Sequence, residues 1–178
     1  LLAAARRLFI EKGYADTGTP EIVEAAGVTR GALYHHFEDK RALFAAVVEQ
    51  EARAVAAEIE AAAPAHLDPR QALIAGGDAY LAAMRQPGRI RLLLVDGPAA
   101  LGPERMAALD ASAGGGTLRD GLAQAFTTAS LQAAPPLDAT VALLSAAFDR
   151  AALAIDAGGD AAAYRAAIIA LIDGLLRT

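Results

Sequence analysis

Apolar residues recur every three or four positions along most of this chain, a spacing typical of amphipathic helices. Residues 1–12 place Leu1, Ala5 and Leu8 on one stripe, and a glycine follows at position 13, where helices commonly end. Residues 40–62 predict a long helix with one continuous face, made of Phe44, Val47, Val48, Glu51, Val55 and Ile59. No segment shows the alternation of apolar and polar residues that is typical of a strand, so the pattern predicts an all-α fold.

The second half of the chain continues this pattern. We expect a helix from Asp68-Pro69 to about Gln86, after a break at residues 64–69. Residues 89–95 form an apolar run that we interpret as a short helix, because a single strand would have no partner. A further helix is expected over 103–131 with a break at 114–116, and two antiparallel helices over 137–157 and 160–177. About nine helices result.

Between the first helix and the long helix, the sequence predicts two shorter helices. Hydroxyl groups of Thr17 and Thr19, with Pro20 in a first turn, indicate the start of one helix, whose buried stripe is Ile22, Val23 and Ala26. Gly27 then makes a turn, and Thr29 can cap the next helix. In that helix Leu33 and Phe37 face inward, whereas Arg30, Tyr34 and His35 lie off this face. Two short helices joined by a glycine turn form a helix-turn-helix.

The spacing of these residues resembles the DNA-binding domain of TetR-family transcriptional regulators. The resemblance covers roughly residues 1–48 and rests on Gly13-Tyr14, Thr17-Gly18-Thr19, residues 22–28 and residues 33–40. The rest of the chain resembles the family in being helical and of the expected length. Residues 92–98 (LLLVDGP) look like a segment of some members. The resemblance implies an N-terminal three-helix domain over 1–46 and a larger helical ligand-binding and dimerisation domain over 47–178.

The resemblance also implies which residues contact DNA. Phosphate contacts are expected from Thr17 or Thr19, and from Tyr34, His36 and Lys40. The start of the second short helix is expected to approach base edges, through Thr29, Arg30, Gly31, Ala32 and His35. A guanidinium can pair with guanine O6 and N7, which discriminates against a wrong base by roughly 1–3 kcal/mol. Two alternatives stay open: Tyr34 as a surface aromatic residue and Thr19 as a helix cap only.

The net charge of the N-terminal region does not by itself indicate a DNA-binding surface. Residues 1–50 carry six Lys and Arg against seven Asp and Glu, a balance of minus one. Segregation of the charges would reconcile this balance with DNA binding, because the local potential matters more than the sum. The chain also begins at Leu1, without a methionine and within its first expected helix, so we expect a preceding segment with basic residues.

Composition narrows the class of protein. Alanine makes up roughly a quarter of the 178 residues and favours helices. The apolar runs are shorter than the ~20 residues needed to span a bilayer, and no leader peptide is evident. The absence of cysteine excludes disulfides and thiolate metal sites. We therefore expect a cytoplasmic protein without a membrane association.

Catalytic and metal-binding motifs are absent from the sequence. It contains no Gly-x-Ser-x-Gly elbow, no phosphate loop ending in Gly-Lys-Ser/Thr and no His-Glu-x-x-His helix. The neighbouring His35 and His36 point to different sides of a helix, which disfavours a shared metal. Gly114–Gly116 lacks the following lysine of a phosphate cradle. We expect no enzymatic activity, no cofactor and no metal.

The last helices carry candidate dimer and effector residues. In TetR-family proteins the last two helices form a four-helix dimer interface, so the resemblance suggests a homodimer through these helices. The candidate interface residues are Leu144, Phe148, Tyr164, Ile168, Leu171 and Leu175. Candidate effector-pocket residues are bulky or charged groups on the preceding helices, namely Tyr80, Met84, Arg91, Asp96, Phe126 and Phe148. A monomer that buries the apolar stripe internally is the alternative.

These observations converge on one hypothesis. We expect a dimeric repressor that binds double-stranded DNA at a near-palindromic operator and is released by a small-molecule effector. The long helix over 40–62 would transmit the effector signal to the DNA-binding domain. One alternative is a helical ligand-binding or enzymatic module with a vestigial DNA-binding head, and another is an architectural DNA binder without an effector.

Overall fold

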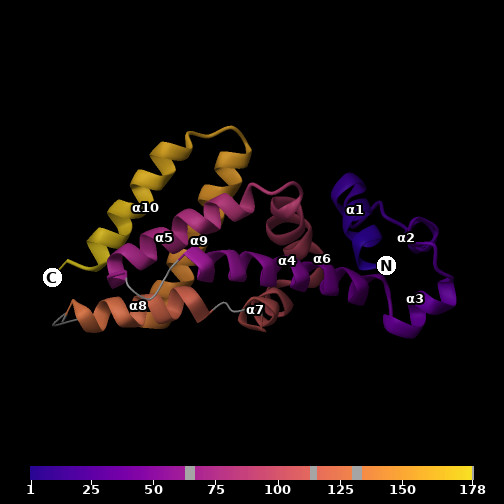
Figure 1. Cartoon of the computed structure of the whole chain (residues 1–178), viewed down its shortest axis with the longest axis horizontal. Coiled ribbons are helices and arrows are strands. Elements are labelled where there is room, and N and C mark those ends of the chain that lie inside the picture. The colour runs from indigo at the N-terminus through magenta and orange to yellow at the C-terminus, as the bar shows by residue number, and fades with distance from the viewer. Residues whose placement is uncertain (63–66, 113–115, 130–133, 178) are drawn as a thin grey trace. The chain divides into compact units, whose positions relative to one another are not determined.

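A computed structural model describes residues 1–62, 67–112, 116–129 and 134–177 of the chain. Over these residues the structure has ten α-helices, one π-helical segment and no strand (Figure 1). The expectation of an all-α fold with an N-terminal helix-turn-helix and a C-terminal helical domain is confirmed. None of the described helices has the length and apolar content that crossing a membrane requires.

The chain folds into two compact units. The first comprises Leu1–Arg53 and Pro87–Ala113, and the second comprises Ala54–Gln86 and Gly114–Thr178. The first unit contains α1 (Leu2–Lys12), α2 (Thr19–Ala26), α3 (Arg30–His36), the start of α4 (Lys40–Ala62), the π-helix η1 (Ile90–Asp96), α6 (Gly97–Leu101) and α7 (Pro103–Ser112). The second contains the end of α4, α5 (Pro69–Met84), α8 (Gly116–Thr128), α9 (Leu137–Asp156) and α10 (Ala161–Leu175).

An aromatic cluster holds the first unit together. The Phe9 ring of α1 meets the Phe44 ring of α4 edge-on, with 5.0 Å between their centroids. The Tyr14 ring lies 4.7 Å from that of Phe44. Ile22 of α2 and Leu33 of α3 are fully buried. The stripes expected for the first three helices are partly confirmed. Their buried members are Ala5, Leu8, Ile22 and Leu33, and their half-buried members are Leu1, Val23, Ala26 and Phe37.

One buried acidic side chain ties three elements of the first unit together. The Glu51 carboxylate of α4 accepts hydrogen bonds from Arg6 Nε of α1 at 2.6 Å and from Arg89 Nε, just before η1, at 3.2 Å. Burial alone raises the pKa of Glu51, but its hydrogen bonds and charge interactions with Arg6 and Arg89 outweigh this and lower it. Glu51 therefore stays ionised inside the unit and links α1 and α4 to the chain that enters η1.

The second unit has its own apolar core. The buried members are Leu73, Leu122, Ala125, Phe126, Leu144, Phe148, Ala151, Ile168 and Ile172. They come from α5, α8, α9 and α10, so these four helices surround one cluster. The Phe148 ring packs closely against Gly77, where an added Cβ would lie 2.6 Å from the ring. A glycine in α5 thus allows an aromatic ring of α9 to contact the helix backbone.

The structure differs from the expected elements at the apolar run over residues 89–95. The apolar run expected as a short helix ending near residue 96 is the π-helix η1, and the helical path continues directly into α6. The helix expected over 103–131 is divided into α7 and α8; the predicted break at 114–116 overlaps residues 113–115, which lie outside the described part, as do 63–66. Residues 87–113 share a compact unit with α1–α3.

Candidate nucleic-acid interface

Local sequence signals define the start of α3. The Ala32 N–H donates to Thr29 Oγ1 at 3.1 Å, so Thr29 is the predicted N-cap. Before it, Gly27 adopts the left-handed conformation with φ 64°, and the following Val28 N–H donates to Val23 O at 3.0 Å. The turn between α2 and α3 is therefore fixed at both ends, and the prediction of Thr29 as the helix cap is confirmed.

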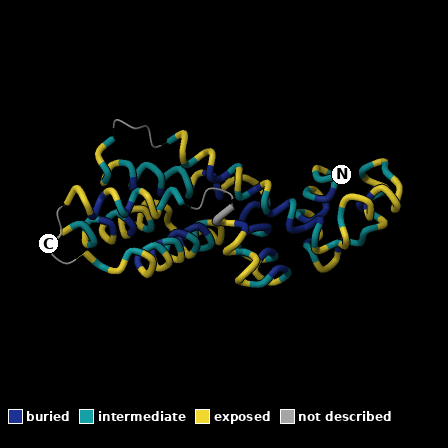
Figure 2. The backbone as a smooth tube through the Cα atoms, turned by 90° about the horizontal axis from the view of Figure 1, so that it is seen from below, coloured by how far each residue is buried: buried dark blue, intermediate teal, exposed yellow. Residues whose placement is uncertain are grey.

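The outer face of α3 is exposed to solvent. Leu33 is fully buried and Phe37 is half-buried, whereas the remaining α3 residues are exposed, namely Arg30, Gly31, Ala32, Tyr34, His35 and His36 (Figure 2). An added Cβ at Gly31 would meet only Thr29 Oγ1, at 3.9 Å. Nothing within the described chain therefore requires glycine at this position.

Three of the predicted DNA-binding residues come together across α2 and α3. Side-chain hydrogen bonds with Thr19 and then with Arg30 lower the pKa of Tyr34. The Arg30 guanidinium carbon also lies 5.5 Å from the centroid of the Tyr34 ring. The start of α2 and the exposed face of α3 thus form one polar surface.

Two other predicted residues make hydrogen bonds inside the unit. Thr17 is 1% exposed, and its hydroxyl group donates to Gly13 O at 2.6 Å. Lys40 Nζ donates to Tyr14 O at 2.8 Å and to Thr17 O at 3.0 Å, and lies 4.4 Å from the centroid of the Tyr14 ring. Of the pair Thr17 and Thr19, the side chain at the surface is that of Thr19.

The candidate effector residues fall in two separate places. Tyr80, Met84, Phe126 and Phe148 belong to the second unit, where Tyr80 Oη donates to Asp149 Oδ1 at 2.5 Å and the Tyr80 and Phe148 rings are 5.9 Å apart. Arg91 and Asp96 belong to the first unit, where hydrogen bonds join them to each other and to α1 and Tyr14. The two groups of candidate residues therefore belong to different compact units.

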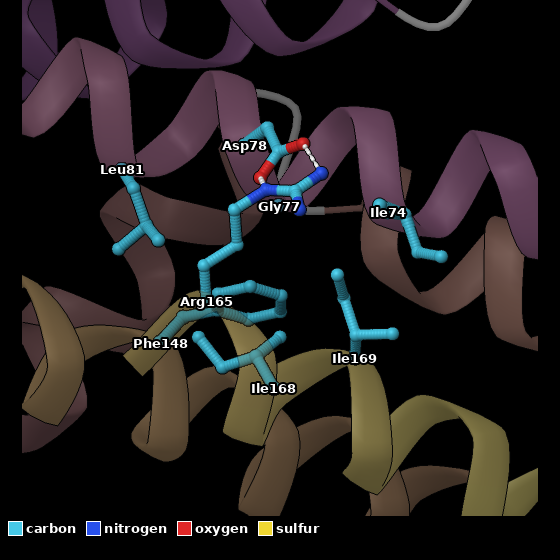
Figure 3. Close-up of a pocket in the computed structure, with 8 residues that line it drawn as sticks. All are labelled: Ile74, Gly77, Asp78, Leu81, Phe148, Arg165, Ile168 and Ile169. Atoms are coloured by element: carbon cyan, nitrogen blue, oxygen red, sulfur yellow. Dashed lines mark hydrogen bonds and ion pairs between the residues drawn. The ribbon is translucent and has the colours of Figure 1, made fainter. Parts of the chain in front are cut away.

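The second unit has a small hollow beside Phe148. It is lined by Ile74, Gly77, Asp78 and Leu81 of α5, Phe148 of α9, and Arg165, Ile168 and Ile169 of α10 (Figure 3). Arg165 donates two hydrogen bonds of 2.7 Å to Asp78 across the hollow. Its walls are otherwise apolar, and sequence reasoning identified only Phe148 among the candidate pocket residues that line it. No cluster of three metal-ligating side chains occurs among residues that the structure describes.

The candidate dimer residues divide between the inside and the outside of the second unit. Leu144, Phe148 and Ile168 are buried in the unit's own core, and Tyr164 and Leu175 are half-buried against it. Leu171 is 52% exposed, and Leu143, which the sequence pattern did not single out, is 74% exposed. The exposed large apolar side chains of α9 and α10 are thus Leu143 and Leu171.

This fold and surface define a helix-turn-helix protein of the DNA-binding class. The family model described as "Bacterial regulatory proteins, tetR family" matches residues 1–47. The model described as "Tetracyclin repressor-like, C-terminal domain" matches residues 70–178. The chain therefore belongs to the tetR family of bacterial transcriptional regulators, as its resemblance indicated.

Individual relatives agree with this assignment. The chain is 51% identical over 49 residues to the HTH-type transcriptional regulator AcrR of Shigella flexneri, covering 28% of this chain and 23% of that protein. It is 42% identical over 57 residues to the HTH-type transcriptional repressor Rv1474c of Mycobacterium tuberculosis, covering 32% and 30%. These alignments span less than a third of the curated relatives.

A solved structure extends the similarity to nearly the whole chain. A TetR-family transcriptional regulator from Pectobacterium atrosepticum is 32% identical, with a TM-score of 0.73, over 99% of this chain and 90% of that one. The fold is therefore shared by the N-terminal and C-terminal parts alike.

Proposed function

We propose that this protein is a dimeric repressor that recognises a near-palindromic double-stranded DNA operator through α3. One observation carries the proposal: α3 is capped by Thr29 and presents an exposed polar face that begins with Arg30 and Gly31. A recognition helix reads base edges in the major groove through its N-terminal residues. The repressor name of the Mycobacterium tuberculosis relative supports the sign of regulation.

Each exposed residue has a role that suits its chemistry. Arg30 can donate two hydrogen bonds to a guanine, and Gly31 and Ala32 allow the helix backbone to approach the bases. His35 lies on the same exposed surface and can read a base edge. Thr19, Tyr34 and His36 have hydroxyl or ring N–H groups that can donate to phosphate oxygens, and Lys40 adds positive charge behind them.

Local charge supports this surface although the chain has a net charge of −5. No acidic residue occurs from Ala25 to Phe37, the stretch that contains the turn and all of α3. Within the same stretch lie Arg30 and two histidines. The phosphate backbone therefore meets a segment without carboxylates, whatever the sign of the whole chain.

We propose that dimerisation uses the exposed faces of α9 and α10. Leu143 and Leu171 are the large apolar side chains that protrude there. Exposed small residues accompany them on the two helices, namely Ala139, Ala142, Ala146, Ala163, Ala166, Ala167 and Ala170. Small side chains let helices of two chains approach closely around protruding leucines, and a twofold dimer presents two α3 helices to two half-sites.

We also propose that a small molecule binds in the second unit and weakens DNA binding. We assign the ligand to the hollow beside Phe148, which combines apolar walls with the charged pair of Asp78 and Arg165 and would have to widen to admit it. The test is a panel of small aromatic compounds added to the protein–DNA complex. A compound that releases DNA while the far-ultraviolet circular dichroism stays unchanged supports the proposal. Compounds that bind the protein without affecting DNA would contradict it.

The experiment that tests the DNA-binding proposal is selection of bound sequences from a random double-stranded pool at physiological salt. We expect the wild-type chain to enrich a twofold-symmetric motif, and Arg30→Ala to enrich a motif that is less specific at particular bases. Enrichment of no sequence would favour a ligand-binding or enzymatic module with a vestigial head. Binding of all sequences alike, with a steep salt dependence, would favour an architectural DNA binder.

A further inference from the structure

The turn between α1 and α2 is held by charged side chains from two other elements of the first unit. Asp96, the last residue of η1, accepts a hydrogen bond from the Tyr14 N–H at 3.0 Å. Lys40, the first residue of α4, donates to the Tyr14 carbonyl oxygen at 2.8 Å. Both backbone polar groups of Tyr14 are thus bound to side chains of opposite charge, and such hydrogen bonds are stronger than those between neutral groups.

Arg91 of η1 holds the end of α1 next to this turn. Its Nη1 donates to Ile10 O and its Nη2 donates to Lys12 O, each at 3.2 Å. Both carbonyl groups lie in the last turn of α1, where carbonyl groups have no partner within the helix and a positive charge is favourable. Arg91 Nε also donates to Asp96 Oδ2 at 3.3 Å, so the two η1 side chains orient each other.

Gly13 makes room for this arrangement. Its φ of +91° lies in the region that favours glycine, and an added Cβ would lie 2.3 Å from Arg91 Nη2. The glycine that ends α1 therefore also gives the guanidinium its place against the helix end. We call Arg91 and Asp96 the η1 clamp.

The clamped turn leads directly to the proposed DNA interface. Thr17 lies within it and is fixed by hydrogen bonds to Leu8 O and Gly13 O. Thr19 begins α2 two residues later, and its hydroxyl group is the main cause of the lowered pKa of Tyr34 on α3. The same turn also holds the Lys40 ammonium through Tyr14 O and Thr17 O. The positions of three proposed phosphate-binding groups therefore depend on the geometry of one turn.

We propose that Arg91 and Asp96 are positioning residues for operator binding. They act from η1 on the α1–α2 turn and so set the positions of Thr19, Tyr34 and Lys40, without touching DNA themselves. This inference rests on the proposed function, because it concerns how well the interface fits an operator. It also gives residues 92–98 a role that the sequence pattern left open.

The test is the effect of Asp96→Ala on operator affinity. An explanation by net charge alone and an explanation by the η1 clamp predict changes in opposite directions. Removing a negative charge should strengthen DNA binding slightly if only net charge matters. The η1 clamp predicts the reverse, a loss of about tenfold in affinity for the selected operator, because the Tyr14 N–H loses its charged acceptor. Asp173→Ala is the matched control, since it removes the same charge from an ion pair with Arg70 in the second unit.

Two further measurements distinguish a positioning role from general damage to the fold: the affinity of conservative variants, and the affinity for a scrambled duplex. Asp96→Asn keeps an oxygen acceptor for the Tyr14 N–H, so its affinity for the operator should be close to that of the wild type. Arg91→Lys keeps the charge but loses the forked donor that binds Ile10 O and Lys12 O, so its affinity for the operator should fall. Affinity for a scrambled duplex should fall less than affinity for the operator in Asp96→Ala, because non-specific binding depends mainly on the interface charges, which are intact, and less on the exact fit of each phosphate contact. An equal loss for operator and scrambled duplexes, or operator binding as tight as that of the wild type, would overturn the inference.

Hydrogen exchange of the Tyr14 amide measures the clamp without DNA. We expect faster exchange in Asp96→Ala than in the wild type and in Asp173→Ala. Unchanged exchange at Tyr14 would refute the clamp itself. A wild-type chain that prefers no duplex would instead refute the proposed function, and the operator role of the clamp with it, even where the Tyr14 amide is protected by Asp96.

Discussion

Replacement of Glu51 by alanine tests how the first unit is held together. The substitution removes a carboxylate that accepts hydrogen bonds from Arg6 at 2.6 and 3.3 Å and from Arg89 at 3.2 Å. The side chains of Glu51 and Arg89 are each 8% exposed, whereas that of Arg6 is 35% exposed. Both guanidinium groups would lose their shared acceptor, and one of them is deeply buried.

The size of the effect follows from this difference in exposure. Breaking a buried ion pair costs about 3–5 kcal/mol, because a charge is left in a poorly solvated place. Water can reach Arg6, which reduces the cost, so we expect Glu51→Ala to lower the free energy of unfolding by about 2–3 kcal/mol. Urea unfolding at pH 7, followed by circular dichroism, measures this loss.

A control lies on the same helix. Glu49 pairs with Arg53 at 2.5 Å, and the Arg53 side chain is 63% exposed. Because solvent-exposed pairs contribute little, Glu49→Ala should change the free energy of unfolding by no more than about 0.5 kcal/mol. Equal losses in Glu49→Ala and Glu51→Ala would refute the role that we assign to the buried carboxylate.

The same variant predicts a pH dependence. The pKa of Glu51 is lowered in the folded protein from the ordinary value of 4.5, so folding favours its ionised form. Its contribution is complete above the unfolded value and is lost as the pH falls through the lower folded value. The stability difference between wild type and Glu51→Ala should therefore shrink below pH 4.5. A difference that grows on acidification would contradict this assignment.

Three further predictions concern the proposed interface and dimer. Arg30→Ala should reduce discrimination at particular operator bases by roughly 1–3 kcal/mol, measured with single-base operator variants; a uniform loss on all of them would argue against base reading. Thr29→Ala should lower the free energy of unfolding by about 1 kcal/mol through loss of the α3 cap, and an unchanged urea midpoint would count against this. The double variant Leu143→Glu and Leu171→Glu should sediment as a monomer that binds the operator weakly, since charges would be buried at the contact; a stable dimer would move the interface elsewhere.

Local signals in the sequence were sufficient to predict most helices. The predicted bounds of α4 agree with the structure, and the cap at Thr29 is confirmed. These features depend on residues close together in the chain: a capping hydroxyl, a proline in a first turn, or a glycine at a helix end. Such signals operate before any long-range contact forms, so a sequence pattern can identify them.

The path from η1 into α6 was not predictable in the same way. The sequence suggested that a helix ends at Asp96-Gly97-Pro98, but the chain continues as α6. Pro98 lies in the first turn of α6, where its missing N–H costs nothing. Gly97 is buried, and an added Cβ would lie 2.6 Å from Leu92 O, so close packing requires the glycine. The Gly-Pro pair thus marks the junction between η1 and α6, and the helical path does not end there.

Long-range contacts decided the environments of the site residues. Arg91 and Asp96 are charged side chains in an apolar run, and their partners on α1 and in the following turn lie 79 to 82 positions away in the sequence. Likewise the apolar stripe of α10 does not reveal that Ile168 lies in the core that α10 shares with α5 and α9 and that Leu171 is exposed. Periodicity identifies a face but not the surface that covers it.

The most direct test of the central claim is the ratio of dissociation constants for the selected operator and a scrambled duplex of equal length, measured at physiological salt with the wild-type chain. The account predicts that the operator binds at least about 10³-fold more tightly, with two chains on each twofold site. Equal affinity for both duplexes would contradict a sequence-specific regulator.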